Sequence, residues 1–188
     1  MFLITSLFDE LPLAMAIETE RRPDKLVSHL RTAIEVARAL TELHRLNIFH
    51  VDLNPMNILS RVEKGWPVIR IVDFESSYEV ARHSAGEFYN PPTTSGYSAP
   101  ELAHQVPDAR ADVFSLGAVL YTMLVGCRWA WEGAADVCVQ ADGALDPELK
   151  GVLLKAVDPS PDKRYASVKA FEAALGAFLE RIWPGRSW

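Results

Sequence analysis

The sequence predicts a mainly α (α+β) fold, and three features of its pattern support this prediction. Between residues 25 and 47, apolar residues recur every three or four positions, as they do along one face of an amphipathic helix. The run VFSLGAVLYTMLVGC is shorter than the about 20 residues that span a bilayer, so it is expected to be a buried core helix over 112–126. Two short β-type runs, NILS and VIRIVDF, add small β-hairpins. The apolar positions of the first helix are Leu26, Leu30, Ile34, Ala37, Leu40 and Leu43.

The first half of the chain contains the segments that are expected to form β-strands. MFLITSL (residues 1–7) is a short β-type run that ends in the turn-like FDELP. After the long helix, NILS and VIRIVDF flank the segment RVEKGWP (61–67). Gly65 and Pro67 in that segment suit a hairpin connection between two strands.

The second half of the chain begins with a loop and continues as helices. Residues 75–100 contain Gly, Pro, Ser and Thr without a period, which predicts a long loop. Long loops in compact domains are usually functional. Further helices are expected over 112–126, 146–157 and 167–183, with a poorly defined stretch at 129–142.

Length and composition indicate one cytoplasmic domain. With 188 residues, 49% of them hydrophobic, the chain has enough apolar material for one core, so residues 1–188 are expected to form a single domain. A formal net charge of −6 argues against nucleic acid or an anionic membrane as a partner, because both need a basic face. Cys127 and Cys138 have neither zinc spacing nor a disulfide framework, which fits a reducing compartment.

The segment FHVDLNPMNIL contains candidate catalytic and metal-binding residues. Metal-assisted phosphoryl transfer needs a carboxylate near the attacking hydroxyl and hard oxygen ligands for Mg²⁺. Asp52 could orient and deprotonate a hydroxyl, and Asn57 could offer an amide oxygen to the metal. Alone, such a pair is more readily explained as turn capping. The later IVDFES, in which Asp73 would bind the metal, favours the phosphoryl-transfer interpretation.

These motifs resemble those of the eukaryotic-type (Hanks-type) Ser/Thr protein kinases, of the kind found in bacteria, over essentially the whole chain. The resemblance is to the C-terminal lobe of that fold. Aminoglycoside- and choline-type small-molecule kinases share the H-x-D-x4-N loop and often D-F-E, but the later motifs are not expected in them. The motifs, in order, are HVDLNPMN (50–57), DFE (73–75), TTSGYSAPE (93–101), DVFSLGAVLYTMLVG (112–126) and DPSPDKRYAS (158–167).

The resemblance implies ATP with Mg²⁺ or Mn²⁺ as cofactor and assigns roles in the site. The catalytic positions are Asp52, Asn54 and Asn57, and the metal ligands are Asn57 and Asp73. Residues 1–12 would be the remnant of the last strand of the small N-terminal lobe and the hinge. Leu59 and the hinge would contact the nucleotide, although core packing is an equal explanation for both. The hinge residues in question are Ser6, Leu7 and Phe8.

Five further residues are expected to be structural. By resemblance, Glu101 pairs with Arg164, where loss of one partner costs roughly 3–5 kcal/mol in a buried setting. Asp112 is expected to accept N–H bonds from the catalytic loop and fix its strained geometry. His50 and Phe74 would stack upward toward the small lobe, so an exposed apolar patch is expected there.

The sequence departs from the family in four places. No glycine precedes Gly65 and no lysine precedes Lys25, so the small lobe with its Gly-rich loop and phosphate-binding lysine is expected to be absent. Asn54 stands where the family has a lysine that assists the transferring phosphate, and Val51 where it has an arginine. Glu75 replaces the glycine of D-F-G and adds a carboxylate that could face the metal.

Two classes of function remain open. The first is a Ser/Thr protein kinase, inactive as an isolated chain, whose small lobe is missing or supplied by another polypeptide. The second is a pseudokinase-type binding scaffold that docks a partner on its exposed upper face; a small-molecule kinase is a weaker third. The retained Asp52, Asn57 and Asp73 favour an enzymatic origin, whereas Asn54 favours loss of activity.

Overall fold

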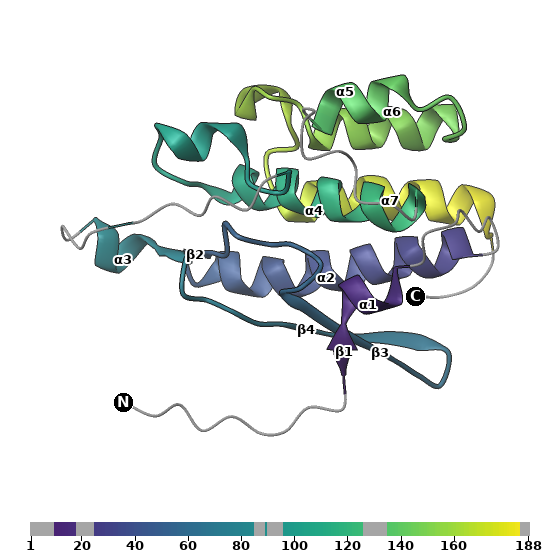
Figure 1. Cartoon of the computed structure of the whole chain (residues 1–188), viewed down its shortest axis with the longest axis horizontal. Coiled ribbons are helices and arrows are strands. Elements are labelled where there is room, and N and C mark those ends of the chain that lie inside the picture. Colours follow the sequence, from purple (N-terminus) through teal and green to yellow (C-terminus); the bar gives the residue numbers. More distant parts are fainter. Residues whose placement is uncertain (1–9, 18–24, 85–88, 90–95, 126–134, 185–188) are drawn as a thin grey trace.

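The computed structural model describes residues 10–17, 25–84, 89, 96–125 and 135–184, and in this part of the chain helices dominate over two small sheets (Figure 1). The N-terminal run at 1–7 and the hinge residues Ser6, Leu7 and Phe8 lie outside the described residues. In chain order the elements are β1 (Leu11–Pro12), α1 (Leu13–Ala16), α2 (Leu26–Arg45), β2 (Ile48–Phe49), β3 (Ile58–Glu63), β4 (Trp66–Ile71), β5 (Tyr78–Glu79), α3 (Val80–His83), a 3₁₀ helix (Pro100–Ala103), α4 (Ala109–Val125), α5 (Ala135–Ala141), α6 (Pro147–Ala156), a second 3₁₀ helix (Pro161–Lys163) and α7 (Val168–Ile182).

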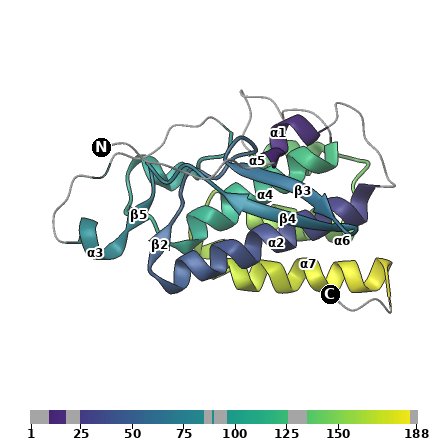
Figure 2. The ribbon, with the colours of Figure 1, turned by 90° about the horizontal axis from the view of Figure 1, so that it is seen from below.

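Helix α2 lies between the β3–β4 hairpin and helix α7 (Figure 2). The apolar period seen in the sequence forms its buried face, with Leu30, Ile34, Ala37 and Leu40 in the core. Leu26 and Leu43, at the two ends of that pattern, are only partly buried. The predicted amphipathic helix is therefore confirmed.

Helix α4 is buried on nearly all sides, which explains why its sequence has no polar face. It begins three residues before the predicted start, where the Asp108 carboxylate accepts a hydrogen bond from Arg110 N at 2.8 Å. Gly117 allows a close approach to α6, because a Cβ at this position would lie 2.9 Å from the Cβ of Ala156. Helices α5 and α6 lie beyond α4 on the side away from the hairpin (Figure 1).

The β3–β4 hairpin corrects the predicted strand boundaries. The segment RVEKGWP is not a seven-residue connection, because Glu63 pairs directly with Trp66 and only Lys64 and Gly65 form the turn. Both turn residues have positive φ, 51° and 83°, as a type I′ turn requires. Pro67 lies in β4, the edge strand of the sheet β1-β3-β4, where its missing N–H costs no ladder bond on the open side.

The predicted long loop at 75–100 also needs correction. Strand β5 pairs antiparallel with β2 and is followed directly by α3. The rings of Phe49 and Tyr78 stack across this pair, with centroids 6.4 Å apart. Two-residue strands are too short to show a period in the sequence, which explains why the pattern did not reveal them.

The C-terminal helices agree with the prediction to within one residue at each end. Asp146 caps α6 by accepting hydrogen bonds from Glu148 N at 2.9 Å and Leu149 N at 3.3 Å. Ser167 caps α7 by accepting from Ala170 N at 3.1 Å. Within the predicted poorly defined stretch 129–142, the described part forms α5.

Candidate active site

The catalytic-loop segment, residues 50–57, is held in place by the core helix α4. The Asp112 carboxylate accepts hydrogen bonds from the backbone N–H of His50 at 2.9 Å and of Val51 at 2.7 Å. Val51 has φ 57°, a left-handed conformation that costs energy for a β-branched residue. The two backbone hydrogen bonds that the resemblance implies for Asp112 are present, and they tie a strained loop to the core.

His44 is a third partner of Asp112 that sequence reasoning missed. Its Nε2 lies 2.7 Å from Asp112 Oδ2, and the Asp112 side chain is fully buried. The ring also packs edge-on against Phe49, with centroids 5.3 Å apart. His44 lies four residues after Leu40 and seven after Ala37, in line with the buried face of α2, so a histidine on an apolar helix face was the signal that the sequence offered.

Two asparagines turn the loop around the backbone of Asp52. Asn54 Nδ2 and Asn57 Nδ2 each donate to the carbonyl oxygen of Asp52 at 3.0 Å. Asn54 Oδ1 also accepts from Met56 N at 2.9 Å, and both asparagines are almost fully buried. Asn54 therefore stabilises the conformation of the loop. Its amide group points into the loop, whereas a lysine that contacts a phosphate would have to point out of it.

Asp73 lies beside this loop because the hairpin brings its two ends together. Ile58 pairs with Ile71, and Val72 N donates to the carbonyl oxygen of Asn57 at 3.0 Å, one residue before Asp73. Asp73 has φ 66° and an exposed side chain, so the chain turns sharply there. The metal ligands proposed from sequence, Asn57 and Asp73, therefore flank the same junction.

The donor set at this junction suits a hard cation. An amide oxygen and a carboxylate are ligands that Mg²⁺ accepts, with the remaining positions filled by water and phosphate oxygens. No group of three or more His, Cys, Asp and Glu side chains that could hold a metal occurs among the described residues. Glu75, although exposed, does not complete such a group with Asp73 in the described part of the chain.

His50 and Phe74 contact one another, but they differ in exposure. Their ring centroids are 5.1 Å apart in an edge arrangement, and His50 Nε2 is 3.0 Å from the carbonyl oxygen of Val72. Phe74 is 41% exposed, in agreement with the expected apolar patch. His50 is fully buried, so the expectation that it points outward with Phe74 is wrong: it fills the space between the loop and the end of β4.

Glu101 and Arg164 pair as the sequence predicts. Arg164 Nη1 and Nη2 donate to the two carboxylate oxygens of Glu101 at 2.6 and 2.7 Å, and both side chains are buried. The segment before Glu101 is docked on α4 by two contacts that the sequence did not indicate. Ser115 Oγ donates to the carbonyl oxygen of Tyr97 at 2.8 Å, and Tyr97 Oη is 3.1 Å from Thr122 Oγ1.

Tyr89 is a further residue beside the loop that sequence reasoning missed. Its ring packs edge-on against Tyr78, with centroids 5.1 Å apart. Burial raises the pKa of the Tyr89 phenol, and the negative charges of Asp112 and Asp52 raise it further. The Tyr89 phenol therefore stays protonated at physiological pH, and its described ring contacts are to Tyr78 and His83.

This arrangement of loop, hairpin junction and buried ion pair has counterparts in known proteins. A family model described as the protein kinase domain matches residues 2–173. The chain belongs to the protein kinase family. Its kinase motifs are thus matched across nearly the whole sequence, including those on α4 and in the segment around Arg164.

Relatives of this kinase chain include bacterial Ser/Thr protein kinases. The "Serine/threonine-protein kinase Pkn1" of Myxococcus xanthus is 32% identical over 95% of the chain and 27% of Pkn1. The "Serine/threonine-protein kinase PknB" of Mycolicibacterium smegmatis is 31% identical over 84% of the chain and 27% of PknB. The chain thus spans about a quarter of the length of these relatives.

A solved structure supports the kinase fold independently. The Mycobacterium tuberculosis PknI kinase domain superposes with a TM-score of 0.66 at 23% identity, covering 91% of this chain and 63% of that one. Similarity at this level of identity shows the fold alone. Among the described helices, none combines the length and the apolar composition that a bilayer span requires.

Proposed function

We propose that this chain forms the large, catalytic lobe of a Ser/Thr protein kinase, which transfers a phosphoryl group from ATP to hydroxyl groups of proteins. The observation that carries this proposal is the loop at 50–57, held by the buried Asp112 so that Asp52 lies beside the Asn57–Asp73 junction. Catalysis of phosphoryl transfer consists mostly of positioning and charge stabilisation, and a rigid loop supplies positioning.

Each residue of the site then has a defined task. Asp52 would orient the acceptor hydroxyl and take its proton, whereas Asn57 and Asp73 would hold Mg²⁺ or Mn²⁺. ATP bound with that metal supplies the phosphoryl group. Leu59, which is half-buried on β3 and pairs with Pro12 of β1, would contact the nucleotide.

We further propose that the 188-residue chain, purified alone, does not phosphorylate proteins. Its sequence contains no glycine before Gly65 and no lysine before Lys25, so these residues include neither a Gly-rich cover nor a phosphate-binding lysine ahead of the site. Without a cover, water reaches the phosphates and screens the charges that act on them. A small lobe supplied in addition would restore turnover.

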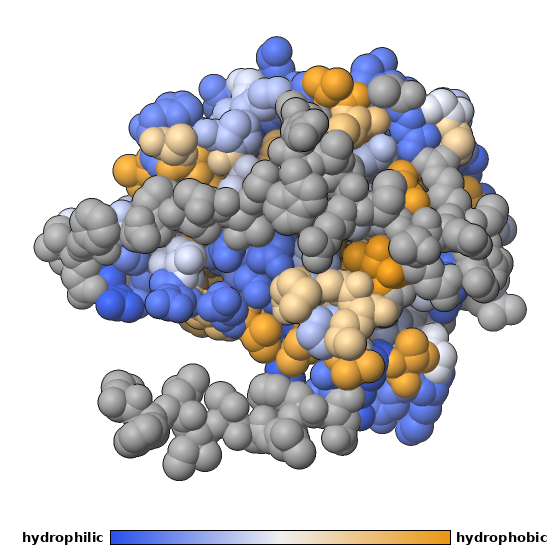
Figure 3. All heavy atoms as spheres, in the orientation of Figure 1, coloured by the Kyte–Doolittle hydropathy of each residue, from blue (hydrophilic) through white to orange (hydrophobic). Residues whose placement is uncertain are grey.

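A second candidate, a pseudokinase-type scaffold, is favoured by one specific observation. Asn54 occupies the position of the family's lysine, and both its Nδ2 and its Oδ1 form hydrogen bonds within the loop. This position therefore supplies no positive charge to the site. Apolar side chains also gather over β1, α1 and the adjoining part of the hairpin (Figure 3), and Leu11 and Val62 there are 60% and 73% exposed. A protein partner would cover such a surface.

Phosphate transfer to a general acceptor protein tests the two candidates. The purified chain is assayed with radiolabelled ATP and myelin basic protein, first alone and then co-expressed with the small lobe of a related Ser/Thr kinase. The kinase proposal expects no signal alone and a signal with the added lobe. Asp52→Asn should abolish that signal, whereas Glu42→Gln, the same change on the exposed face of α2, should not alter it.

Two outcomes of this assay each contradict one of the proposals: the first contradicts the kinase function, and the second contradicts the need for a small lobe. If the complemented protein binds ATP yet transfers no phosphate, the scaffold proposal is favoured. If the isolated chain gives strong transfer that depends on Asp52, the phosphates are held by groups other than those named here, and the proposed need for a small lobe is wrong.

A further inference from the structure

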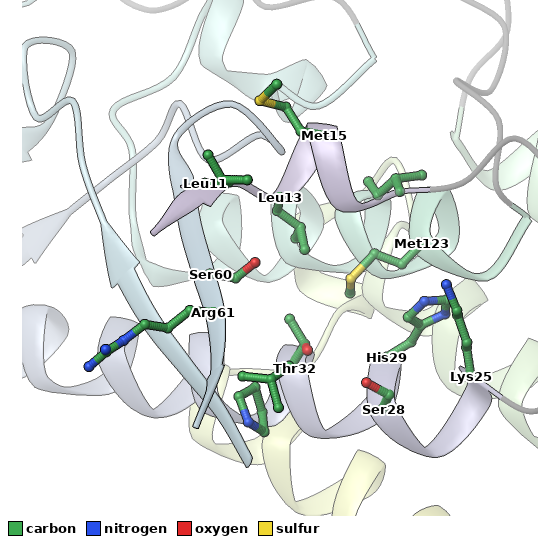
Figure 4. Close-up of a pocket in the computed structure, with 13 residues that line it drawn as sticks. Leu11, Leu13, Met15, Lys25, Ser28, His29, Thr32, Ser60, Arg61 and Met123 are labelled. Carbon is green, nitrogen blue, oxygen red and sulfur yellow. The ribbon is translucent and has the colours of Figure 1, made fainter. Parts of the chain in front are cut away.

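Two side-chain hydroxyls line a pocket of about 400 Å³ between α1, strand β3 and the start of α2 (Figure 4). Thr32 enters the wall from α2 and Ser60 from β3, and the Ser60 hydroxyl points toward the middle of the pocket. Thr32 is only 7% exposed, so its hydroxyl belongs to a buried wall. The described lining contains none of the residues assigned to phosphoryl transfer.

The Thr32 and Ser60 hydroxyls have no hydrogen-bond partner within the described part of the chain. Thr41, on the same helix as Thr32, shows the usual arrangement, because its Oγ1 donates to the carbonyl oxygen of Ala37 at 2.8 Å. Buried polar groups of folded proteins are nearly always hydrogen-bonded, and leaving one unbonded costs stability. A buried, unbonded threonine therefore indicates a polar group that binds in the pocket. Since a hydroxyl both donates and accepts, the two side chains suit a ligand hydroxyl.

The cationic side chains of the lining do not define the ligand, because they are engaged in other interactions. Lys25 and His29 have partners of their own. The Arg61 guanidinium is 3.0 Å from the Glu63 carboxylate and points away from the pocket (Figure 4). The two hydroxyls thus remain as the groups that position a ligand, and they favour a neutral one.

The apolar part of the wall favours an aromatic ligand. Leu13 and Met123 are almost fully buried, and Met15 is 71% exposed at the mouth. Methionine side chains adapt to irregular shapes, and their sulfur atoms make favourable contacts with aromatic rings. A ring between these three side chains would also remove the apolar surface of Met15 from water. The volume is typical of small-molecule sites.

We propose that this pocket binds a small neutral aromatic molecule with a hydroxyl group, such as a phenol with a short alkyl substituent. The ring packs against Leu13 and Met123, and the ligand hydroxyl forms hydrogen bonds with Thr32 Oγ1 and Ser60 Oγ. The inference does not depend on the proposed phosphoryl transfer, because the lining residues differ from those at the Asn57–Asp73 junction. Binding is measurable without any kinase assay.

NMR titration of the whole chain, isotope-labelled in its methionine methyl groups, tests the proposal with para-ethylphenol as the probe. The methyl signals of Met15 and Met123 should shift and reach saturation. The signal of Met56, which lies in the catalytic-loop segment outside the pocket, should not shift. Absence of saturable shifts at Met15 and Met123 in the folded wild type overturns the proposal.

Substitution of the hydroxyls tests the polar contact. Thr32→Val keeps the shape of the side chain, so it should weaken binding of para-ethylphenol about fivefold or more. It should not weaken binding of para-ethyltoluene, in which a methyl group replaces the hydroxyl. Ser60→Ala should show the same selectivity, whereas Thr41→Val, the matched change on α2 outside the pocket, should leave both affinities unchanged. Equal weakening of the two ligands by Thr32→Val overturns the proposal, because the hydroxyl would then not be recognised.

Circular dichroism and thermal unfolding of each variant distinguish loss of binding from loss of the fold. Thr32→Val should unfold at the same temperature as the wild type or at a higher one, because the hydroxyl that it removes has no partner among the described residues. The substitution thus maintains or raises stability while it lowers affinity for the phenol. A lower unfolding temperature would mean that the Thr32 hydroxyl is bonded within the protein, and it would also overturn the proposal.

Discussion

Glu101 and Arg164, which are 63 residues apart in sequence, form a bidentate ion pair, and both side chains are buried. Arg164 also donates to the carbonyl oxygens of Asp158 at 2.7 Å and Arg110 at 3.0 Å, and its guanidinium lies over the ring of Phe114. The pair thus joins the end of the 96–101 segment to the start of α4 and to the segment before α7. Its hydrogen bonds satisfy charges that would otherwise be costly to bury.

The first prediction concerns this pair. Glu101→Ala and Arg164→Ala should each lower the free energy of unfolding by about 3–5 kcal/mol, because each leaves a buried charge without its partner. The double variant should lose less than the sum of the two, since the second substitution removes the orphaned charge. Urea denaturation of all four proteins measures the coupling. Losses that add to within the error would show that the two residues do not act as a pair.

The second prediction concerns Asp112. Asp112→Ala removes the acceptor for two buried N–H groups and for His44, so it should lower the free energy of unfolding by at least about 2 kcal/mol. His44→Ala leaves both backbone bonds in place and should cost clearly less. Chemical denaturation compares the two variants. A larger loss from His44→Ala would mean that the histidine, and not the loop, is what Asp112 stabilises.

The third prediction concerns the contact between α4 and α6. Gly117→Ala places a Cβ 2.9 Å from Ala156 Cβ and 3.0 Å from Val157 Cγ1, and such overpacking should cost about 1–3 kcal/mol. Gly176→Ala in α7 is the matched control, because a Cβ there meets nothing within 4 Å. It should leave stability unchanged or raise it by up to about 1 kcal/mol through helix propensity. Thermal unfolding distinguishes the two, and equal melting temperatures would contradict the close approach.

The fourth prediction concerns the metal. Mg²⁺ alone should bind weakly, because Asn57 and Asp73 supply few ligands, and it should bind more tightly when a nucleotide adds phosphate oxygens. Asp73→Ala should abolish the metal-dependent part of nucleotide binding in a calorimetric titration. Glu75→Gln should change it little, because Glu75 does not complete a metal-binding group in the described structure. Metal binding that survives Asp73→Ala would place the site elsewhere.

The sequence predicted the parts of this structure that have a local cause. The helices follow from apolar periods and caps such as Asp146 and Ser167, and the Glu101–Arg164 pair and the role of Asp112 followed from family resemblance. The β2–β5 pair, the burial of His50 and the contact of His44 with Asp112 could not be predicted. Each depends on residues far apart in sequence, and strands β2 and β5 are in addition too short to show a period.

The attachment of the 50–57 loop to α4 has a consequence for how this part of the molecule fluctuates. The amide protons of His50 and Val51 are bonded to a side chain on the most buried helix, so exchanging them with solvent requires the loop to detach from the core. Segments whose amides open only with the core behave as one cooperative unit, with opening free energies near that of global unfolding. We therefore expect the amides of His50 and Val51, at the start of the loop that carries Asp52, to exchange as slowly as those of the core. Any ligand that moved the start of this loop would have to break the two bonds that tie it to the most buried helix.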